Sequence, residues 1–325
     1  MNSHLLRHYL RWIGSAVALV AVVVVLMFTL LELTPGDPIQ SLVGNMPVSE
    51  DLRAELTAQF GLDRPVVERF FHYVGNVLTG DLGYSYANKL PVLPLVLTRL
   101  NNTLLLVIPS LLLSSILGVL LGAIAAATRS KKLDSLLSTT AVAGFSLPSF
   151  WLGLVLIIIF SVQLKWLPAQ GMRSYTSKGL SIPHMILPVI TLTVTEMAFK
   201  LRLMRATMIE VLGQDYIDTA RSKGLSRAAI LWRHAIPNSM LPMITVIGYS
   251  IGYTVAGTVL VEKVFGWPGL GMLLYESIQR SENMVVMAIL LIVAVMVIVI
   301  NLLTDVLLGF VDPRVRKKLQ AGGQA

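Results

Sequence analysis

Long apolar runs alternate with shorter polar segments along the 325 residues of the chain. A bilayer core about 30 Å thick needs roughly 20 apolar residues in a helix, and six runs reach this length. The pattern therefore predicts an all-α membrane protein with six transmembrane helices. They are expected near Trp12 to Leu33, Asn101 to Thr128, Ser135 to Leu164, His184 to Met204, Ser239 to Val261 and Met284 to Phe310.

The segment between the first two runs is too long for a simple connection, and we expect a structured loop there. Ser49 is placed to cap a helix in which Leu52, Leu56 and Phe60 share one face and which Gly61 would end. A plain linker is the alternative interpretation. The predicted divisions are residues 1–33 with the first helix, 34–98 with the loop, 99–311 with a five-helix core, and the tail 312–325.

Composition supports the membrane assignment and removes several kinds of chemistry. The chain is 55% hydrophobic and only 14% charged, whereas soluble domains carry about 25% charged residues. It has no cysteine, and its five histidines include a single closely spaced pair, His4 and His8, so we expect neither disulfides nor a metal site. The dipeptide Gly-Lys is absent, which excludes the phosphate loop of ATPases, and no HExxH signature occurs. We therefore expect a protein that is not an enzyme and binds no cofactor itself.

The distribution of basic residues predicts an orientation. The net charge is +8, and an amino terminus in the cytoplasm places 16 of the 26 Lys and Arg residues on the inner side. This arrangement satisfies the positive-inside rule. Both termini are then cytoplasmic, and the loop 34–98 lies outside.

A polar, basic segment, YIDTARSKGLSRAAILWRHAIPNSMLP, separates the fourth and fifth runs on the cytoplasmic side. The pattern predicts one helix from Met208 to Ser222, a turn in which Gly224 takes a positive φ, and a second helix that Ser226 caps and Pro237 ends. The small residue Ala220 would let a partner surface approach closely. Docking into a groove of a soluble partner, an amphipathic helix on lipid, and a plain connector are the three interpretations. Nucleic-acid binding is disfavoured because the membrane would hold the segment against the bilayer.

This segment resembles the cytoplasmic motif of permease subunits of ATP-binding-cassette (ABC) importers, in the dipeptide, oligopeptide and nickel branch. That motif has Glu-Ala-Ala, three residues, Gly, nine residues, an apolar residue and, three positions later, Pro. The chain has Asp218, Thr219 and His234 where the general motif has Glu, Ala and an apolar residue. Its sequences RSKGLS and RHAIPNS are similar to those of the branch. The resemblance implies a coupling helix seated on an ATP-binding subunit, with contact residues Tyr216, Asp218, Thr219, Ala220, Lys223, Gly224, Arg227, His234 and Pro237.

Three further stretches, ELTPGDP, GDLGYSY and VEKVFGWPGLG, look like signatures of the same branch and fall in order on the predicted outer side. Their characteristic residues are Pro35, Gly36, Asp37, Pro38, Gly80, Asp81, Gly83, Pro268, Gly269 and Gly271.

The resemblance implies a type I importer fold in a bacterial inner membrane. It also implies a second, homologous permease, one or two ATP-binding subunits that hold ATP and Mg, and an extracytoplasmic solute-binding protein. The solute would be a peptide, or alternatively nickel or a metal–metallophore complex. An ATP-independent secondary carrier or channel, and a membrane scaffold, are the alternative classes.

Glu196, Lys200 and Asp305 are ionisable residues within the apolar runs, where charge is costly and commonly functional. Glu196 and Lys200 are four residues apart and can pair on one helix face. We expect this pair and Asp305 to belong to the translocation pathway. The alternatives are a pair at the cytoplasmic end of the helix, because Arg202 and Arg205 follow, and a boundary charge at Asp305.

Overall fold

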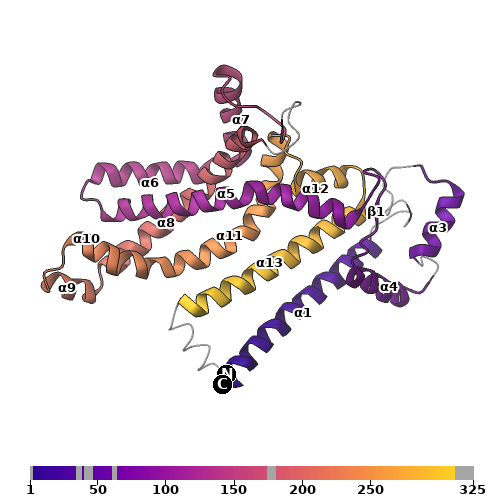
Figure 1. Ribbon diagram of the computed structural model, residues 1–325, viewed down its shortest axis with the longest axis horizontal. Helices are drawn as coiled ribbons and strands as arrows, with labels where there is room; N and C mark the ends of the chain where they lie inside the picture. The colour runs from indigo at the N-terminus through magenta and orange to yellow at the C-terminus, as the bar shows by residue number, and fades with distance from the viewer. Residues whose placement is uncertain (1–2, 34–38, 40–46, 61–63, 174–180, 312–325) are drawn as a thin grey trace. The chain divides into compact units, whose positions relative to one another are not determined.

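The structure is a computed structural model that describes residues 3–33, 39, 47–60, 64–173 and 181–311 (Figure 1). The tail 312–325, Gly61 and the motif residues Pro35, Gly36, Asp37 and Pro38 lie outside the described residues.

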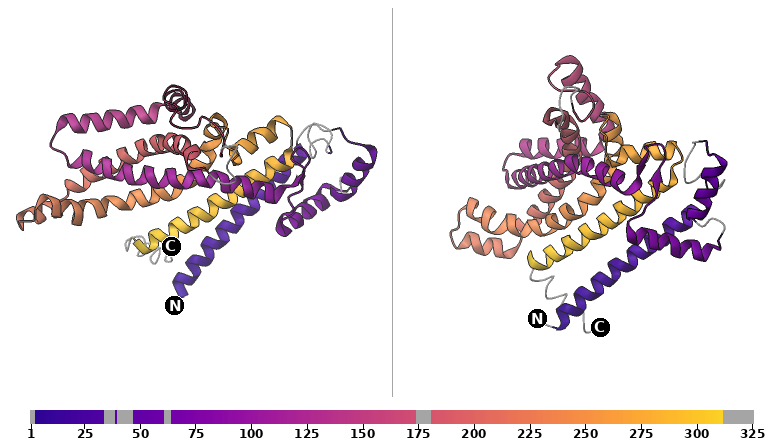
Figure 2. Two further views of the ribbon diagram at one scale, coloured as in Figure 1. Left: turned by 45° about the horizontal axis from the view of Figure 1, so that its top comes forward. Right: turned by 45° about the vertical axis from the view of Figure 1, so that its right-hand side comes forward.

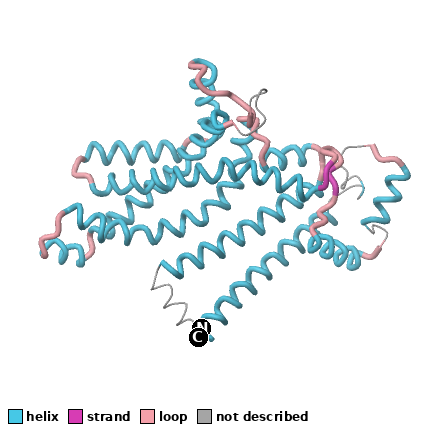
Figure 3. Tube along the Cα trace, in the orientation of Figure 1, coloured by secondary structure: helices cyan, strands magenta, loops and turns pink. Residues whose placement is uncertain are grey.

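The described chain is almost entirely helical, with one short antiparallel hairpin that pairs Tyr84 with Pro91 and Ser85 with Leu90 (Figure 3). The elements are α1 (Ser3–Leu33), α3 (Glu50–Phe60), α4 (Val66–Thr79), β1 (Tyr84–Ser85), β2 (Leu90–Pro91), α5 (Val92–Ala127), α6 (Lys131–Ser146), α7 (Ser149–Leu156), η1 (Ile157–Gln163), α8 (Ile182–Leu212), α9 (Asp215–Ser222), α10 (Arg227–Ile230), η2 (Leu231–Ala235), α11 (Ile236–Val264), α12 (Leu270–Gln279) and α13 (Asn283–Val311).

Four helices, α1, α5, α8 and α13, are long and apolar enough to cross a membrane, and two bent helix pairs bring the candidate spans to six. The prediction of an all-α membrane protein is confirmed. The third predicted helix, Ser135 to Leu164, is not straight, because α6 and the α7–η1 segment meet at 102°. Pro148 explains the break: it lacks an N–H group, and it disfavours helical geometry at Leu147, whose ψ is 128°.

Two compact units are distinguished by their internal contacts, and each is described separately. Unit 1 holds residues 1–8, 105–267 and 300–325, and unit 2 holds 9–104 and 268–299.

In unit 1, α6, α8 and α11 lie side by side (Figure 2). The core contains buried Leu106, Leu187, Leu192, Phe265 and Trp267. Gly118 and Gly122 allow α5 to approach α8 closely, as small residues commonly do between membrane helices.

In unit 2, residues 47–91 form the helices α3 and α4 and the hairpin. The Ser49 hydroxyl accepts a hydrogen bond from the Leu52 amide at 3.3 Å, as predicted for the cap of α3. Leu56 is buried with Met284. The hairpin is held by Glu282, whose carboxylate accepts hydrogen bonds from the Ser85 hydroxyl and the Ala87 amide, both at 3.0 Å. The described part of the long segment is therefore structured, as the sequence indicates.

Candidate docking element and translocation cavity

The first part of the polar segment departs from the predicted single helix over Met208 to Ser222. Helix α8 ends at Leu212, Gly213 and Gln214 form a break, and α9 begins at Asp215. The Gly213 amide bonds the Glu210 carbonyl, and Gln214 is extended with φ −82° and ψ 146°. Because glycine is a poor helix former and an acidic residue is favourable in a first turn, the sequence stops one helix here and starts another.

The turn after α9 matches the prediction. Gly224 has φ +78°, the left-handed conformation that glycine adopts most readily. The Ser226 hydroxyl accepts a hydrogen bond from the Ala229 amide at 3.3 Å and so caps α10.

Pro237 does not end the second helix, contrary to the prediction. The chain continues from α10 through the wider turn of η2 into α11, and Pro237 lies in the first turn of α11. Pro237 lacks an N–H group and so leaves one hydrogen bond of this continuous helix unmade, and the wider turn of η2 stands just before it.

Residues 215–230, which we call the α9–α10 element, have a small core of their own. Ile217, Ala220 and Ile230 are buried against Leu212 and Leu225. Ala220 is only 6% exposed, and its methyl group fills this core; the close approach of a partner at this residue stays a prediction.

The outer surface of the element and of the adjoining η2 is polar, with one exposed aromatic ring on each. Tyr216 is 42% and Trp232, on the adjoining η2, is 66% exposed, and Asp218 pairs with Arg221 at 2.7 Å in solvent. Sequence reasoning overlooked Trp232, although an isolated tryptophan in a basic segment is a usable signal. The remaining predicted contact residues are exposed, except His234, which is half-buried: Thr219, Lys223, Gly224, Arg227 and Pro237.

One bond ties the element to the rest of unit 1. The Arg227 guanidinium donates to the carbonyl of Ala127, the last residue of α5. Cationic side chains are favourable at a helix carboxyl end, where carbonyl groups are unsatisfied. The element is therefore attached to α5 as well as to α8 and α11.

The second candidate site is a cavity of about 590 Å³ in unit 1, between α8, α11 and the α6–α7 bend. Glu196 lines it, together with hydroxyl-bearing and aromatic side chains. Phe145, Ser149, Thr195, Phe199, Tyr249, Ser250, Tyr253 and Thr254 are among these.

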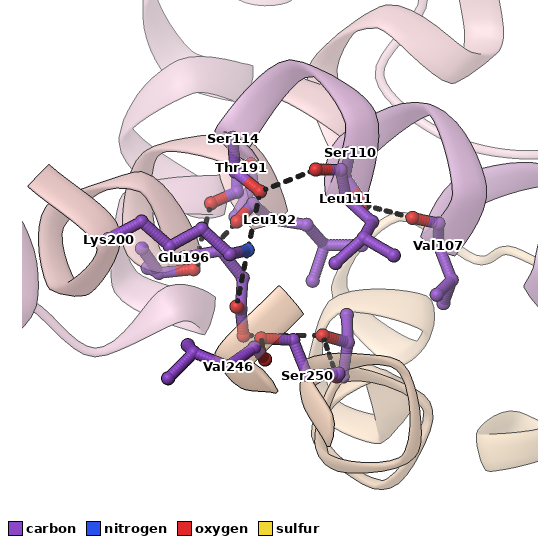
Figure 4. Close-up of polar contacts among 12 residues, drawn as sticks. Val107, Ser110, Leu111, Ser114, Thr191, Leu192, Glu196, Lys200, Val246 and Ser250 are labelled. Atoms are coloured by element: carbon purple, nitrogen blue, oxygen red, sulfur yellow. Dashed lines mark hydrogen bonds and ion pairs between the residues drawn. The ribbon is translucent and has the colours of Figure 1, made fainter. Parts of the chain in front are cut away.

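Glu196 and Lys200 form the predicted pair, with Nζ and Oε2 3.1 Å apart (Figure 4). Lys200 is fully buried, and its Nζ also donates to the Ser114 hydroxyl of α5 at 2.8 Å. Thr254 of α11 donates to the other carboxylate oxygen of Glu196 at 3.3 Å. Only Glu196 of the pair faces the cavity, while Lys200 neutralises its charge from behind.

The other predicted intramembrane charge, Asp305, does not line the cavity. Tyr249 does line the cavity, and its hydroxyl donates a hydrogen bond to the Asp305 carboxylate at 3.1 Å. Arg205 binds both carboxylate oxygens of Asp134, at 2.6 and 2.7 Å, and so links α8 to α6. The pathway role of Glu196, Lys200 and Asp305 stays a prediction.

Sequence reasoning overlooked the glycines that make the Lys200 site possible. A Cβ atom on Gly118 would lie 2.7 Å from the Lys200 Cβ, and one on Gly122 would lie 2.6 Å from the Leu201 carbonyl oxygen. This close approach brings Ser114 within reach of Lys200. The GxxxG spacing of Gly118 and Gly122 in an apolar run is the signal that could have revealed it.

Described residues of two signature stretches, GDLGYSY and the end of VEKVFGWPGLG, have structural roles within unit 2. Gly80, with φ +81°, ends α4, and Gly83, with φ +89°, donates its amide to Asp81 at 3.1 Å. The Pro268 carbonyl accepts from the Asn102 side chain at 2.9 Å. Gly269 is the N-cap of α12, and Gly271 is buried in that helix.

Residues 118–317 match the model of a protein family described as the inner membrane component of binding-protein-dependent transport systems. Residues 5–107 match the model of the amino-terminal part of such components. The chain belongs to this family. It is thus the permease subunit of a binding-protein-dependent ABC importer and carries no ATPase activity of its own.

Individual relatives match the permease over nearly all of its length. The dipeptide transport system permease protein DppB of Escherichia coli K12 is 36% identical, covering 97% of this chain and 100% of the relative. The glutathione transport system permease protein GsiC of Escherichia coli O6:H1 is 38% identical with the same coverage. The di/tripeptide transport system permease protein DppB of Pseudomonas aeruginosa is 38% identical over 90% of this chain and 94% of the relative.

Among solved structures, an inward-facing MetNI methionine ABC transporter chain superimposes with a TM-score of 0.56 at 18% identity. The match covers 67% of this chain and 96% of the other. This similarity concerns the fold alone and agrees with the importer fold that the sequence resemblance implies.

Proposed function

We propose that this permease and a second, homologous permease subunit form the pathway of an ATP-driven importer for short peptides. One or two ATP-binding subunits and a solute-binding protein complete the transporter. Relatives at 36–38% identity are named for dipeptides, di/tripeptides and glutathione, which is itself a tripeptide. These names favour a peptide over nickel or a metal–metallophore complex.

The cavity beside Glu196 is the observation that carries the peptide assignment. Its hydroxyl groups and the Glu196 carboxylate can bond the ammonium and amide groups of a peptide, and its Phe and Tyr rings can contact apolar side chains. Because Lys200 already neutralises Glu196, the cavity offers no strong unpaired charge. A pathway needs such weak sites, since a solute that binds tightly is not released.

The α9–α10 element is the proposed site for the ATP-binding subunit. Its exposed rings and ion pair offer a contact surface, and its own core makes it a rigid body. Arg227 links it to the end of α5, and the backbone links it to α8 and α11, which line the cavity. A movement of the ATP-binding subunit can therefore reach the cavity through contiguous helices.

The proposed orientation places both termini in the cytoplasm and Ser281 outside, as the basic residues favour. The chain has no cysteine, so a single Ser281→Cys variant can be labelled in intact cells. Labelling by a membrane-impermeant maleimide is expected without lysis. Labelling only after lysis would show that Ser281 lies in the cytoplasm and that the orientation is the opposite one.

Uptake by the reconstituted transporter tests the function. Proteoliposomes with all subunits and the binding protein are expected to accumulate radiolabelled dipeptide when ATP is supplied to the ATP-binding subunits. Matched vesicles that lack only the ATP-binding subunit should accumulate none. Dipeptide accumulation by this chain alone would contradict the importer mechanism, and accumulation of Ni²⁺ but no dipeptide by the full complex would contradict the peptide assignment.

A further inference from the structure

Helix α4 has two apolar faces, and within the described part of the chain only one of them is covered. On the covered face, the Phe70 and Tyr73 rings contact Phe28 of α1, with ring centroids 5.2 and 5.8 Å apart. The other face, which we call the outer stripe, consists of residues spaced by four, three and four positions, so they align along the helix. The outer stripe contains Val67, Phe71, Val74 and Leu78, of which Phe71 is 67% and Leu78 is 82% exposed.

The contacts with α1 fix the direction in which α4 runs. Arg69 pairs with Glu32 at 2.9 Å, whereas Tyr73, four residues later on α4, contacts Phe28, four residues earlier on α1. The two helices are therefore antiparallel at this contact, and α4 lies beside the carboxyl end of α1 (Figures 1 and 2). Phe28 belongs to the apolar window Ile13–Leu30 of α1. Leu78, five residues past Tyr73, lies about 7 Å further along α4, in the direction of the middle of that window.

A groove in unit 2 also places the end of α4 level with the apolar window of α1. Val77 and Gly80, at the end of α4, line an apolar groove of about 360 Å³ with Val20 of α1 and with Leu291 and Val295 of α13. Val20, Leu291 and Val295 lie well inside the apolar windows of two candidate membrane spans, α1 and α13. The carboxyl end of α4 is thus at the level of span interiors.

Polarity along α4 decreases in the same direction. The charged residues of the helix, Glu68 and Arg69, stand near its amino end, and Arg69 is paired with Glu32. Further along, the Asn76 and His72 side chains share a hydrogen bond at 3.3 Å, and the Thr79 hydroxyl donates to the Gly75 carbonyl at 3.1 Å. Groups bonded in this way are tolerated where water is scarce.

We infer that α4 turns back into the membrane leaflet at the carboxyl end of α1, with its outer stripe against phospholipid acyl chains. Only part of the loop 34–98 then stands in the aqueous phase. Glu68 and Arg69 cancel in charge, so apolar contact, and not attraction to anionic lipid, holds the helix there. This arrangement fixes the height of the loop at the membrane surface.

Single cysteines in this cysteine-free chain test the inference within the complete transporter in lipid nanodiscs. A bimane probe is attached to Phe71→Cys or Leu78→Cys. Leu19→Cys, on the exposed apolar surface of α1, serves as the lipid reference, and Asp51→Cys, exposed on α3, as the water reference. Quenching by spin-labelled phospholipid is compared with quenching by iodide, in nanodiscs of zwitterionic and of anionic lipid.

Both α4 probes are expected to behave like the Leu19 probe, with a lipid-to-iodide quenching ratio several-fold above that of the Asp51 probe. The ratio should be the same in the two lipid compositions. Iodide quenching at Leu78 equal to that at Asp51 would place α4 in water and overturn the inference. Protection from both quenchers would show that a protein subunit covers the stripe, and would equally overturn it. None of these readouts depends on transport.

Discussion

The α9–α10 element and the Glu196–Lys200 site both hold charge in an apolar chain, but they do so in opposite ways. Asp218 and Arg221 pair in solvent with their side chains more than half exposed, whereas Lys200 is completely buried among Glu196 and Ser114. Exposed pairs contribute about 0–1 kcal/mol, while breaking a buried pair costs about 3–5 kcal/mol. Substitutions should therefore affect stability at the buried pair and partner binding at the exposed element.

The largest effect is expected on breaking the buried pair. Lys200→Met leaves the Glu196 carboxylate without its counter-charge and should destabilise the fold by about 3–5 kcal/mol. The double variant Glu196→Gln with Lys200→Met removes both charges and should recover much of this loss. Thermal unfolding of the purified complex, analysed as a double-mutant cycle, measures both. Glu196→Gln alone completes the cycle, and a loss in the double variant equal to the sum of the two single losses would show that the pair is not coupled.

A smaller loss is expected where α5 meets α8. Gly122→Leu forces a side chain against the Leu201 carbonyl and the Met204 Cβ, which would lie 2.6 and 2.7 Å from the new Cβ. Overpacking of this kind costs about 1–3 kcal/mol. Gly14→Leu is the matched control, because nothing lies within 4 Å of its added Cβ. A lower melting temperature is expected for Gly122→Leu alone, and identical melting of the two variants would contradict the close contact.

The smallest effect on stability is expected at the exposed element. Asp218→Asn removes the solvent-exposed pair with Arg221 and should change stability by less than about 1 kcal/mol. Tyr216→Ala and Trp232→Ala should likewise leave the melting temperature unchanged, yet weaken binding of the ATP-binding subunit. Titration of that subunit onto the purified permease by fluorescence anisotropy measures this. Unchanged affinity in all three variants would show that the ATP-binding subunit docks at another surface.

The sequence predicts apolar helices, caps and turns well because these depend on local residue types. Ser49, Ser226 and Gly224 behave as expected for this reason. Prediction of helix boundaries from the sequence fails where several helix-stopping signals compete. Gly213 breaks a helix, whereas Pro237 does not.

The contacts of the buried Glu196–Lys200 site were only partly predictable from the sequence. The spacing of Glu196 and Lys200 indicates their pairing, but the contact of Lys200 with Ser114 joins two different helices through residues 86 positions apart in sequence. The burial of Ala220 likewise depends on Ile230, which belongs to the next helix. Contacts of this kind follow from tertiary packing, which the pattern along one helix does not contain.

Retention of the ATP-binding subunit by Gly224 variants tests the docking role of the α9–α10 element most directly. Gly224 is exposed, with nothing within 4 Å of an added Cβ, so a side chain there acts through backbone strain at φ +78°. A β-branched residue in this conformation costs on the order of 1–3 kcal/mol, whereas asparagine tolerates it. Gly213→Ala, at an exposed glycine with φ −90°, is the control outside the turn.

During copurification, Gly224→Val should insert into the membrane normally but lose most of the bound ATP-binding subunit together with ATP-driven dipeptide uptake. Gly224→Asn and Gly213→Ala should retain both. Full retention of the subunit and normal uptake by Gly224→Val would contradict the docking role of the α9–α10 element.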